Sequence, residues 1–305
     1  MKPHRLRAPP RRNSGVTLIE LAITIALVGI LGALIVQFVA PVRSYIDTSR
    51  RAALTDTADT ALRRIGRDLR LALPNSVRVN DPDNTFVEFL LVRTGGRYRY
   101  EPGASGTDCG GTTADDVLTF GAPDTCFTSI GNVPNSADVK TSDYVVVYNL
   151  PPGTDKADAY QDTALGTTPC GATCNKAKIT TQPLAAGTGG HRIDFTGGNT
   201  FTYESPGRRF FIIEGAVSYG CAGGVLTRYS GYTNATPETQ PVPPSGASTA
   251  VIATGVTSCN FTYDTSVSAQ GAGLVTMKLQ LGAQISGGST ETITLYHAVH
   301  VNNVP

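Results

Sequence analysis

One carboxylate interrupts a long apolar stretch near the start of the chain. Residues 16–40 contain a single charged residue, Glu20. A charged side chain near the centre of a bilayer costs about 2.5–3.5 kcal/mol, so a carboxylate in such a segment indicates a function. The chemistry open to Glu20 is charge pairing, because an opposite charge offsets the cost of removing the carboxylate from water.

Two histidines near the C-terminus, His297 and His300, are the residues closest to a metal-ligand pattern. Residues three apart on a strand point to opposite faces of the sheet, so these two cannot easily share one ion. A zinc site also needs further ligands, and none stands beside them. The sequence therefore favours one half-buried and one surface histidine, and we expect no metal site.

Six cysteines all follow the apolar stretch, which indicates an oxidising compartment. Six cysteines allow 15 connectivities, and pairing of sequence neighbours is our hypothesis. Cys170 and Cys174 could instead act as metal ligands, but a local disulfide is favoured in such a compartment. The predicted pairs are Cys109–Cys126, Cys170–Cys174 and Cys221–Cys259.

The remaining polar motifs are weak. Asp81 with Asp83, and Asp115 with Asp116, lack the spacing of a calcium loop. Ser218 lacks the first glycine of a nucleophile elbow. Asn234 and Asn260 begin chance-level glycosylation sequons. With no catalytic constellation, we expect no enzymatic activity and no cofactor.

The apolar stretch is expected to be a membrane helix preceded by a targeting segment. A helix over residues 16–40 is about 37 Å long, which is enough for a hydrocarbon core of about 30 Å. Gly29 and Gly32 would let a neighbouring helix approach closely. Residues 1–15 hold five cations and no acid, which predicts a cytoplasmic N-terminus. The cations are Lys2, Arg5, Arg7, Arg11 and Arg12.

An ordinary secretory signal peptide is the alternative for this segment. Its cleavage site needs small residues at both −1 and −3. A cut after Ala40 would place Phe38 at −3, and a cut after Ala33 would place Leu31 there. The alternative therefore lacks a suitable cleavage site.

The helix is predicted to continue to Leu73 as an amphipathic segment over residues 41–73. Pro41 should kink it rather than end it, and Pro74 with Asn75 should end it. We expect Asp68 on the polar face with several arginines. Apolar residues recur at three- and four-residue steps and should pack on the chain's own β domain. They are Ile46, Leu54, Ala58, Ala61, Leu62, Ile65, Leu69 and Leu73.

After residue 74 the hydrophobic period changes to two, which predicts an antiparallel β domain over residues 74–305. Residues 274–281 alternate most clearly, and the glycines at 223–224 indicate a hairpin. Two long loops are expected at 151–182 and 232–250. The predicted fold class is α+β, a long N-terminal helix packed on antiparallel sheets. The predicted strands cover 86–92, 97–100, 117–120, 144–150, 192–195, 200–203, 208–214, 225–229, 260–264, 274–281 and 292–301.

The charge balance argues against nucleic-acid binding. The whole chain has a net charge of +1, and loss of the five leader cations would make it −4. A mildly acidic product offers no basic surface for phosphate groups.

Residues 15–20 (GVTLIE), with the basic leader before them and the apolar helix after them, resemble the signal of type IV prepilins and type II secretion pseudopilins. The resemblance implies that a prepilin peptidase cuts between Gly15 and Val16 and that Val16 is then N-methylated. The family usually has Phe at this position, so Val16 is a departure. It also implies that Glu20 pairs with the terminal amine of a neighbouring subunit during assembly.

Three further stretches are similar to the MshO-like minor pilins of the mannose-sensitive haemagglutinin (MSHA) pilus: residues 67–78, 206–232 and 295–301. This implies a minor pilin that is anchored in the inner membrane and then built into a pilus with other pilin subunits. The initiation or tip complex is its expected place. The alternatives are a J-type minor pseudopilin of a secretion system and, from another class, a membrane-anchored periplasmic enzyme or binding domain.

Overall fold

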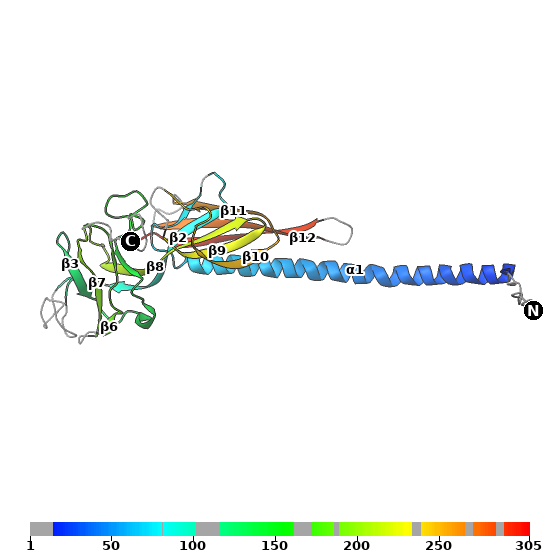
Figure 1. Ribbon diagram of the computed structural model, residues 1–305, viewed down its shortest axis with the longest axis horizontal. Coiled ribbons are helices and arrows are strands. Elements are labelled where there is room, and N and C mark those ends of the chain that lie inside the picture. The colour runs from blue at the N-terminus through cyan, green and yellow to red at the C-terminus, as the bar shows by residue number, and fades with distance from the viewer. Residues whose placement is uncertain are drawn as a thin grey trace, which may run out of the picture. The chain divides into compact units, whose positions relative to one another are not determined.

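The computed structural model describes residues 15–80, 82–101, 116–161, 173–185, 189–233, 239–265, 271–284 and 290–305 (Figure 1). The chain divides into two compact units, residues 1–52 and 53–305. The first unit holds the start of helix α1 (Leu18–Leu69), and the second holds its remainder and all the strands.

Helix α1 ends at Leu69, four residues earlier than the sequence predicts. Arg70 and Leu71 form a turn, and Ala72 makes a β-bridge to Leu91. The N–H of Leu73 donates to the carbonyl of Leu90 at 2.8 Å. The prediction of a helix to Leu73 is therefore wrong, because the residues after the helix pair with strand β2 (Phe86–Arg97) before Pro74 is reached. Helical backbone continues past Pro41, and the predicted kink there stays a prediction.

Among the described residues, the largest sheet has seven strands, all paired antiparallel. Strand β8 is its centre, because β2 lies along one side of it while β4 and β9 share the other. The strands are β1 (Arg78–Val79), β2 (Phe86–Arg97), β4 (Tyr144–Val147), β5 (Lys176–Lys178), β8 (Arg209–Ala222), β9 (Val225–Tyr232) and β10 (Ser248–Thr254).

Two smaller antiparallel sheets complete the β domain. One is ordered β11-β12-β13, and its last two strands are paired over thirteen residues without a bulge. The other is ordered β3-β7-β6. Their strands are β11 (Val256–Asp264), β12 (Ala272–Gln284), β13 (Thr290–Asn302), β3 (Asp124–Thr128), β7 (His191–Asn199) and β6 (Leu184–Ala185).

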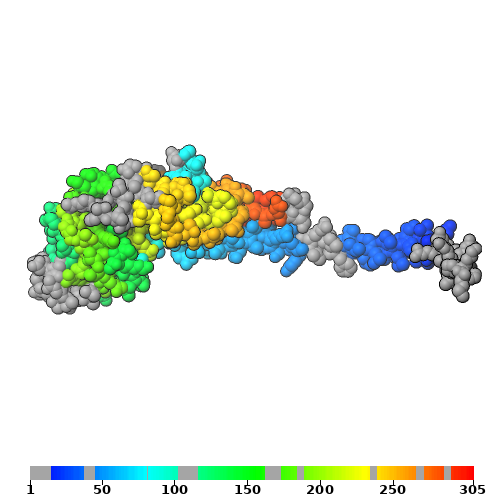
Figure 2. Space-filling model, in the orientation of Figure 1, coloured from blue at the N-terminus to red at the C-terminus, as the bar shows by residue number. Residues whose placement is uncertain are grey.

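Within the described residues the sheets bury their apolar faces in three clusters, and the seven-stranded sheet contributes to each of them. The first cluster joins the buried face of α1 to β2, β8 and the β11-β12-β13 sheet. A second cluster lies between β3, β4, β7 and the start of β8, and a third surrounds Tyr160 and Tyr232. In Figure 2 the green segment of the chain gathers at one end of the second unit, and the yellow and orange strands gather at the other.

The antiparallel α+β architecture is the one that the sequence predicts. The β8–β9 hairpin turns at Gly223 and Gly224, whose φ angles of +57° and +77° suit glycine in a two-residue hairpin loop. Three predicted strands are wrong. Residues 117–120 and 200–203 contribute only isolated bridges, and residues 97–100 contribute only the last residue of β2 and a bridge at Tyr98. Conversely, β5 falls within the loop predicted at 151–182, and β10 begins within the loop predicted at 232–250.

Candidate functional site

Helix α1 begins with a side-chain cap built from two residues of the apolar segment. Thr17 precedes the first helical residue, and its hydroxyl accepts a hydrogen bond from the backbone N–H of Glu20 at 3.3 Å. Threonine followed three residues later by glutamate is the pattern of a capping box. A carboxylate in the first turn is also favoured by the positive end of the helix dipole. The position of Glu20 therefore suits the helix start as well as an assembly role.

The helix after this cap presents apolar side chains all around its surface. Leu18–Gln37 has a mean hydropathy of 2.6 and is long and apolar enough to cross a membrane. Its large side chains are exposed, from 46% for Leu34 to 86% for Leu18. A Cβ atom added at Gly29 or Gly32 would meet no atom within 4 Å, so both positions are open to a neighbour. A surface of this kind needs lipid or other helices around it.

The second half of α1 is attached to the β domain through one apolar stripe, as the sequence predicts. Ala58, Ala61, Leu62, Ile65 and Leu69 are all buried in the first core cluster, and Leu54 packs against it. Ile46, which we placed in the same stripe, is 41% exposed, and Leu73 is buried but lies beyond the helix.

Asp68 lies on the protein-facing side of α1, which corrects the prediction that placed it on the polar face. Its Oδ2 accepts hydrogen bonds from the Tyr219 hydroxyl at 2.7 Å and from the Arg228 Nε at 2.9 Å. An acid in the last turn opposes the helix dipole, so the ion pair with Arg228 offsets an unfavourable position. Burial, followed by the Asp68 carboxylate, raises the pKa of Tyr219, which therefore stays a hydrogen-bond donor.

The helix also approaches strand β13 closely at Gly66. A Cβ atom at this position would lie 3.0 Å from Nε2 of His297 and 3.1 Å from Cγ2 of Val299. His297 is half-buried against the helix and His300 is exposed. The predicted pair of one half-buried and one surface histidine is thus confirmed, and the described residues contain no group of ligands for a metal ion.

A buried charged network that the sequence does not predict joins Arg78 of β1 and Glu88 of β2 to Tyr160 and Tyr232. Glu88 is fully buried, and its two oxygens accept from Arg78 at 2.6 Å and from the Tyr232 hydroxyl at 2.8 Å. The Arg78 guanidinium stacks 4.0 Å from the ring centroid of Tyr160. Burial raises the pKa of Glu88 although Arg78 and Tyr232 act in the opposite direction. The sequence offers no signal for this network, because it is the β1–β2 register that places Arg78 opposite Glu88.

Some of the remaining predicted residues are described by the structure, and the others lie outside the described residues. Cys221 and Cys259 form a disulfide whose Cα atoms are 6.4 Å apart, and this is one of the expected pairs. Cys126 and Cys174 are also disulfide-bonded. Ser218 is buried in β8, where its hydroxyl donates to the carbonyl of Val87. Cys109, Cys170, Asp81, Asp115 and Asn234 lie outside the described residues, as do the leader cations.

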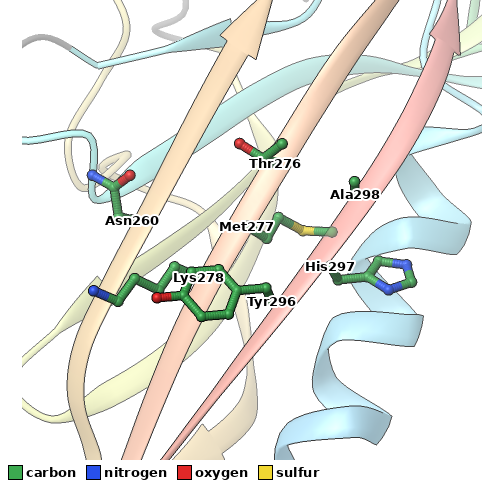
Figure 3. A pocket seen from close by; sticks show the side chains of 7 residues that line it. All are labelled: Asn260, Thr276, Met277, Lys278, Tyr296, His297 and Ala298. Atoms are coloured by element: carbon green, nitrogen blue, oxygen red, sulfur yellow. The ribbon is translucent and has the colours of Figure 1, made fainter.

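An open depression of about 340 Å³ lies on the β11-β12-β13 sheet. In Figure 3 the His297 ring points toward the helix, whereas Lys278 and Tyr296 extend together away from it. The Nζ of Lys278 lies 5.9 Å from the centroid of the Tyr296 ring. The lining contains one lysine, Lys278, and no carboxylate. It is lined by Asn260, Thr276, Met277, Lys278, Tyr296, His297 and Ala298.

Comparison with known families gives a match that falls on the capped apolar segment. The family described as the prokaryotic N-terminal methylation motif matches residues 10–36. Comparisons with curated proteins and with solved structures gave no match. The motif implies processing by a prepilin peptidase and assembly with pilins, and the apolar helix suggests anchoring in the inner membrane before that assembly.

The geometry agrees with this match. An apolar helix, exposed on all sides, begins at a capped turn that carries one carboxylate, and its continuation is fixed to antiparallel sheets. Pilin-like proteins are in general structural subunits rather than enzymes. The chain is a type IV pilin-like protein that carries the prepilin N-terminal methylation motif.

Proposed function

We propose that this chain is a minor pilin, similar to the MshO-like proteins of the MSHA pilus. In this proposal it is cut between Gly15 and Val16, methylated on Val16 and built into a type IV pilus with other pilin subunits. Its role is in pilus biogenesis, within the initiation or tip complex, and it is structural rather than enzymatic.

The observation that carries the proposal is the exposed apolar surface of the segment that follows the motif. Large apolar side chains from Val16 to Val36 have no cover within the described residues. Lipid can cover them while the chain is anchored, and the helices of neighbouring subunits can cover them in a filament. In such a filament, Glu20 would pair with the amine of the neighbouring Val16, because a carboxylate in an apolar environment requires an opposite charge.

The attachment of α1 to the β domain supports the same role. The buried stripe, the ion pair of Asp68 with Arg228 and the close approach at Gly66 all fix the end of the helix to the sheets. Helix packing can therefore position the β domain, which would supply the contacts that are specific to this subunit.

The first test is replacement of Gly15 by phenylalanine. The control is Gly15→Ala, in which the new residue is close to glycine in size. We expect Gly15→Phe to leave the leader attached and to abolish incorporation into pili, while Gly15→Ala retains both. Normal leader removal and assembly in Gly15→Phe would contradict the proposed processing site.

The second test is mass spectrometry of the mature protein. A mass that corresponds to a chain starting at methylated Val16 supports the proposal, and the same measurement reports how many thiols are oxidised. A chain cut elsewhere, or an uncut chain in cells that assemble pili, would contradict it.

A further inference from the structure

A groove of about 470 Å³ lies along strand β2, far in the sequence from the N-terminal motif. Leu71, Val92 and Phe211 give it apolar walls, and Leu71 is 51% exposed. Three arginines, Arg93, Arg97 and Arg209, are also part of the lining. The groove is therefore apolar along its length and basic at its margin.

Gly95 keeps the groove open. A Cβ atom at Gly95 would lie 2.7 Å from the carbonyl oxygen of Phe210 and 3.3 Å from the ring of Phe211. Because the obstacle includes backbone, no side chain fits at this position. Gly96 points to the opposite face, where a Cβ atom would lie 3.0 Å from the buried ring of Phe210. Neither residue between Thr94 and Arg97 therefore has a side chain to cover the groove.

Arg97 and Arg209 face each other across the β2–β8 pair, where their Cα atoms are register partners. Like charges directly opposite each other on a sheet are destabilising. Within the described residues neither side chain forms an ion pair with a carboxylate. Arg93, by contrast, is bound by Asp143 at 2.7 Å and by Glu214 at 3.2 Å. The two facing arginines therefore form a basic pair that an external anion would stabilise.

The side of β2 away from β8 is open over the same residues. The N–H of Val92 donates to the carbonyl of Leu71, and the carbonyl of Arg97 accepts from Ile130. Between these points no backbone hydrogen bond of the described residues reaches β2 from that side. Pro134, whose carbonyl accepts from the Thr94 hydroxyl, stands at the margin.

We propose that this groove binds an extended acidic segment of a partner protein. A carboxylate of the segment would be held by Arg97 and Arg209, and an adjacent apolar side chain would lie on Phe211 and Leu71. A free inorganic anion would use the arginines but not the apolar walls, so charge and lining together favour a peptide. The proposal rests on residues of the β domain and does not depend on the function of the N-terminal motif.

The test uses the full-length chain in detergent and a fluorescently labelled, end-blocked peptide of alternating valine and glutamate. A matched peptide with glutamine in place of glutamate removes the charge and keeps the length. We expect the acidic peptide to bind more tightly than the neutral one. The double variant Arg97→Gln/Arg209→Gln should weaken acidic-peptide binding by about tenfold or more and leave neutral-peptide binding unchanged.

The double variant Arg64→Gln/Arg67→Gln is the matched control, because it removes the same charge from exposed positions on α1. It should bind the acidic peptide like the unmodified chain, and circular dichroism should show that both double variants are folded. Equal binding of the two peptides, or equal loss in both double variants, would overturn the proposal. Inorganic phosphate is added as a competitor. Displacement of the peptide by phosphate at micromolar concentration would identify a free-anion site and would also overturn it.

Discussion

Gly66 of helix α1 lies against His297 of strand β13. A Cβ atom at Gly66 would lie only 3.0 Å from the histidine Nε2, so the absence of a side chain at 66 is what lets the imidazole lie under the helix. Glycine in a helix interior costs about 1 kcal/mol relative to alanine. The close packing at this point offsets that intrinsic cost.

This contact predicts that the effect of Gly66→Ala depends on His297. In the unmodified chain it should lower the free energy of unfolding by about 1 kcal/mol, because the new methyl group overpacks the interface. In a His297→Ala background the loss should be smaller, because only Cγ2 of Val299, at 3.1 Å, still obstructs the methyl group and alanine has the higher helix propensity. Urea unfolding of the full-length chain in detergent, followed by circular dichroism, measures both. Thr60→Ala at an exposed helix position is the control, and equal effects of Gly66→Ala in the two backgrounds would contradict the coupling.

A second prediction concerns Asp68, which binds Tyr219 and Arg228 at the end of the helix. Asp68→Ala should lower the free energy of unfolding by about 1–3 kcal/mol, because it leaves one buried donor, Tyr219, and one half-buried donor, Arg228, without their acceptor. The matched control is Asp59→Ala, which breaks the exposed pair with Arg63 and should cost less than about 0.5 kcal/mol. The same unfolding experiment compares them. Similar losses for the two variants would show that Asp68 contributes no more than a surface pair.

The sequence predicts the elements whose residues alternate strongly or fall at helical spacing. Strand β12 has a clear two-residue period, the stripe from Leu54 to Leu69 has a helical one, and paired glycines mark the β8–β9 turn. The strand and helix patterns are local, because each arises from the burial of one face of one element. The turn glycines, the apolar N-terminal half of α1 and its motif are also local, because each is defined by consecutive residues of the chain.

What the sequence does not predict depends on contacts between distant segments. Strands β3, β5 and β10 have weak patterns and exist because a partner strand lies beside them. The helix ends at Leu69 because β2 pairs with the following residues. In the sequence Asp68 cannot be distinguished from its exposed charged neighbours. Its role is visible only in the fold, where β8 and β9 place Tyr219 and Arg228 next to it. Similarly, Glu88 is a charged residue within a strand pattern, and only the fold shows that its partners are buried with it.

The network around Glu88 predicts a pH dependence of stability. Burial raises the pKa of this carboxyl group in the folded chain above its value of about 4.3 in the unfolded chain. The folded state therefore binds the proton of Glu88 more tightly than the unfolded state does. The contribution of this protonation to the free energy of unfolding is fully present below about pH 4 and is lost as the pH rises through the pKa of Glu88 in the folded chain. Glu88→Gln imitates the protonated form, so its free energy of unfolding should not show this decrease with rising pH.

The measurement is urea unfolding of the full-length chain and of Glu88→Gln between pH 4 and pH 8. The unfolding free energy of the unmodified chain should fall relative to that of the variant as the pH rises. Other carboxyl groups, such as Asp158, whose pKa is also raised by burial, are present in both proteins and cancel in the difference. A difference that does not vary with pH would contradict the raised pKa.

The last prediction separates two roles of Glu20, the helix cap and the assembly charge. Glutamine serves a capping box as glutamate does, so Glu20→Gln should keep the helix start and remove only the charge. If the carboxylate pairs with a neighbouring amine, this variant should be processed normally between Gly15 and Val16 but be absent from sheared pili. Thr17→Ala removes the acceptor of the Glu20 N–H and should cost about 1 kcal/mol of helix stability, with the charge retained. Thr17→Ser is its control. Incorporation of Glu20→Gln at normal levels, together with loss of assembly in Thr17→Ala, would show that the cap and not the charge is what assembly requires.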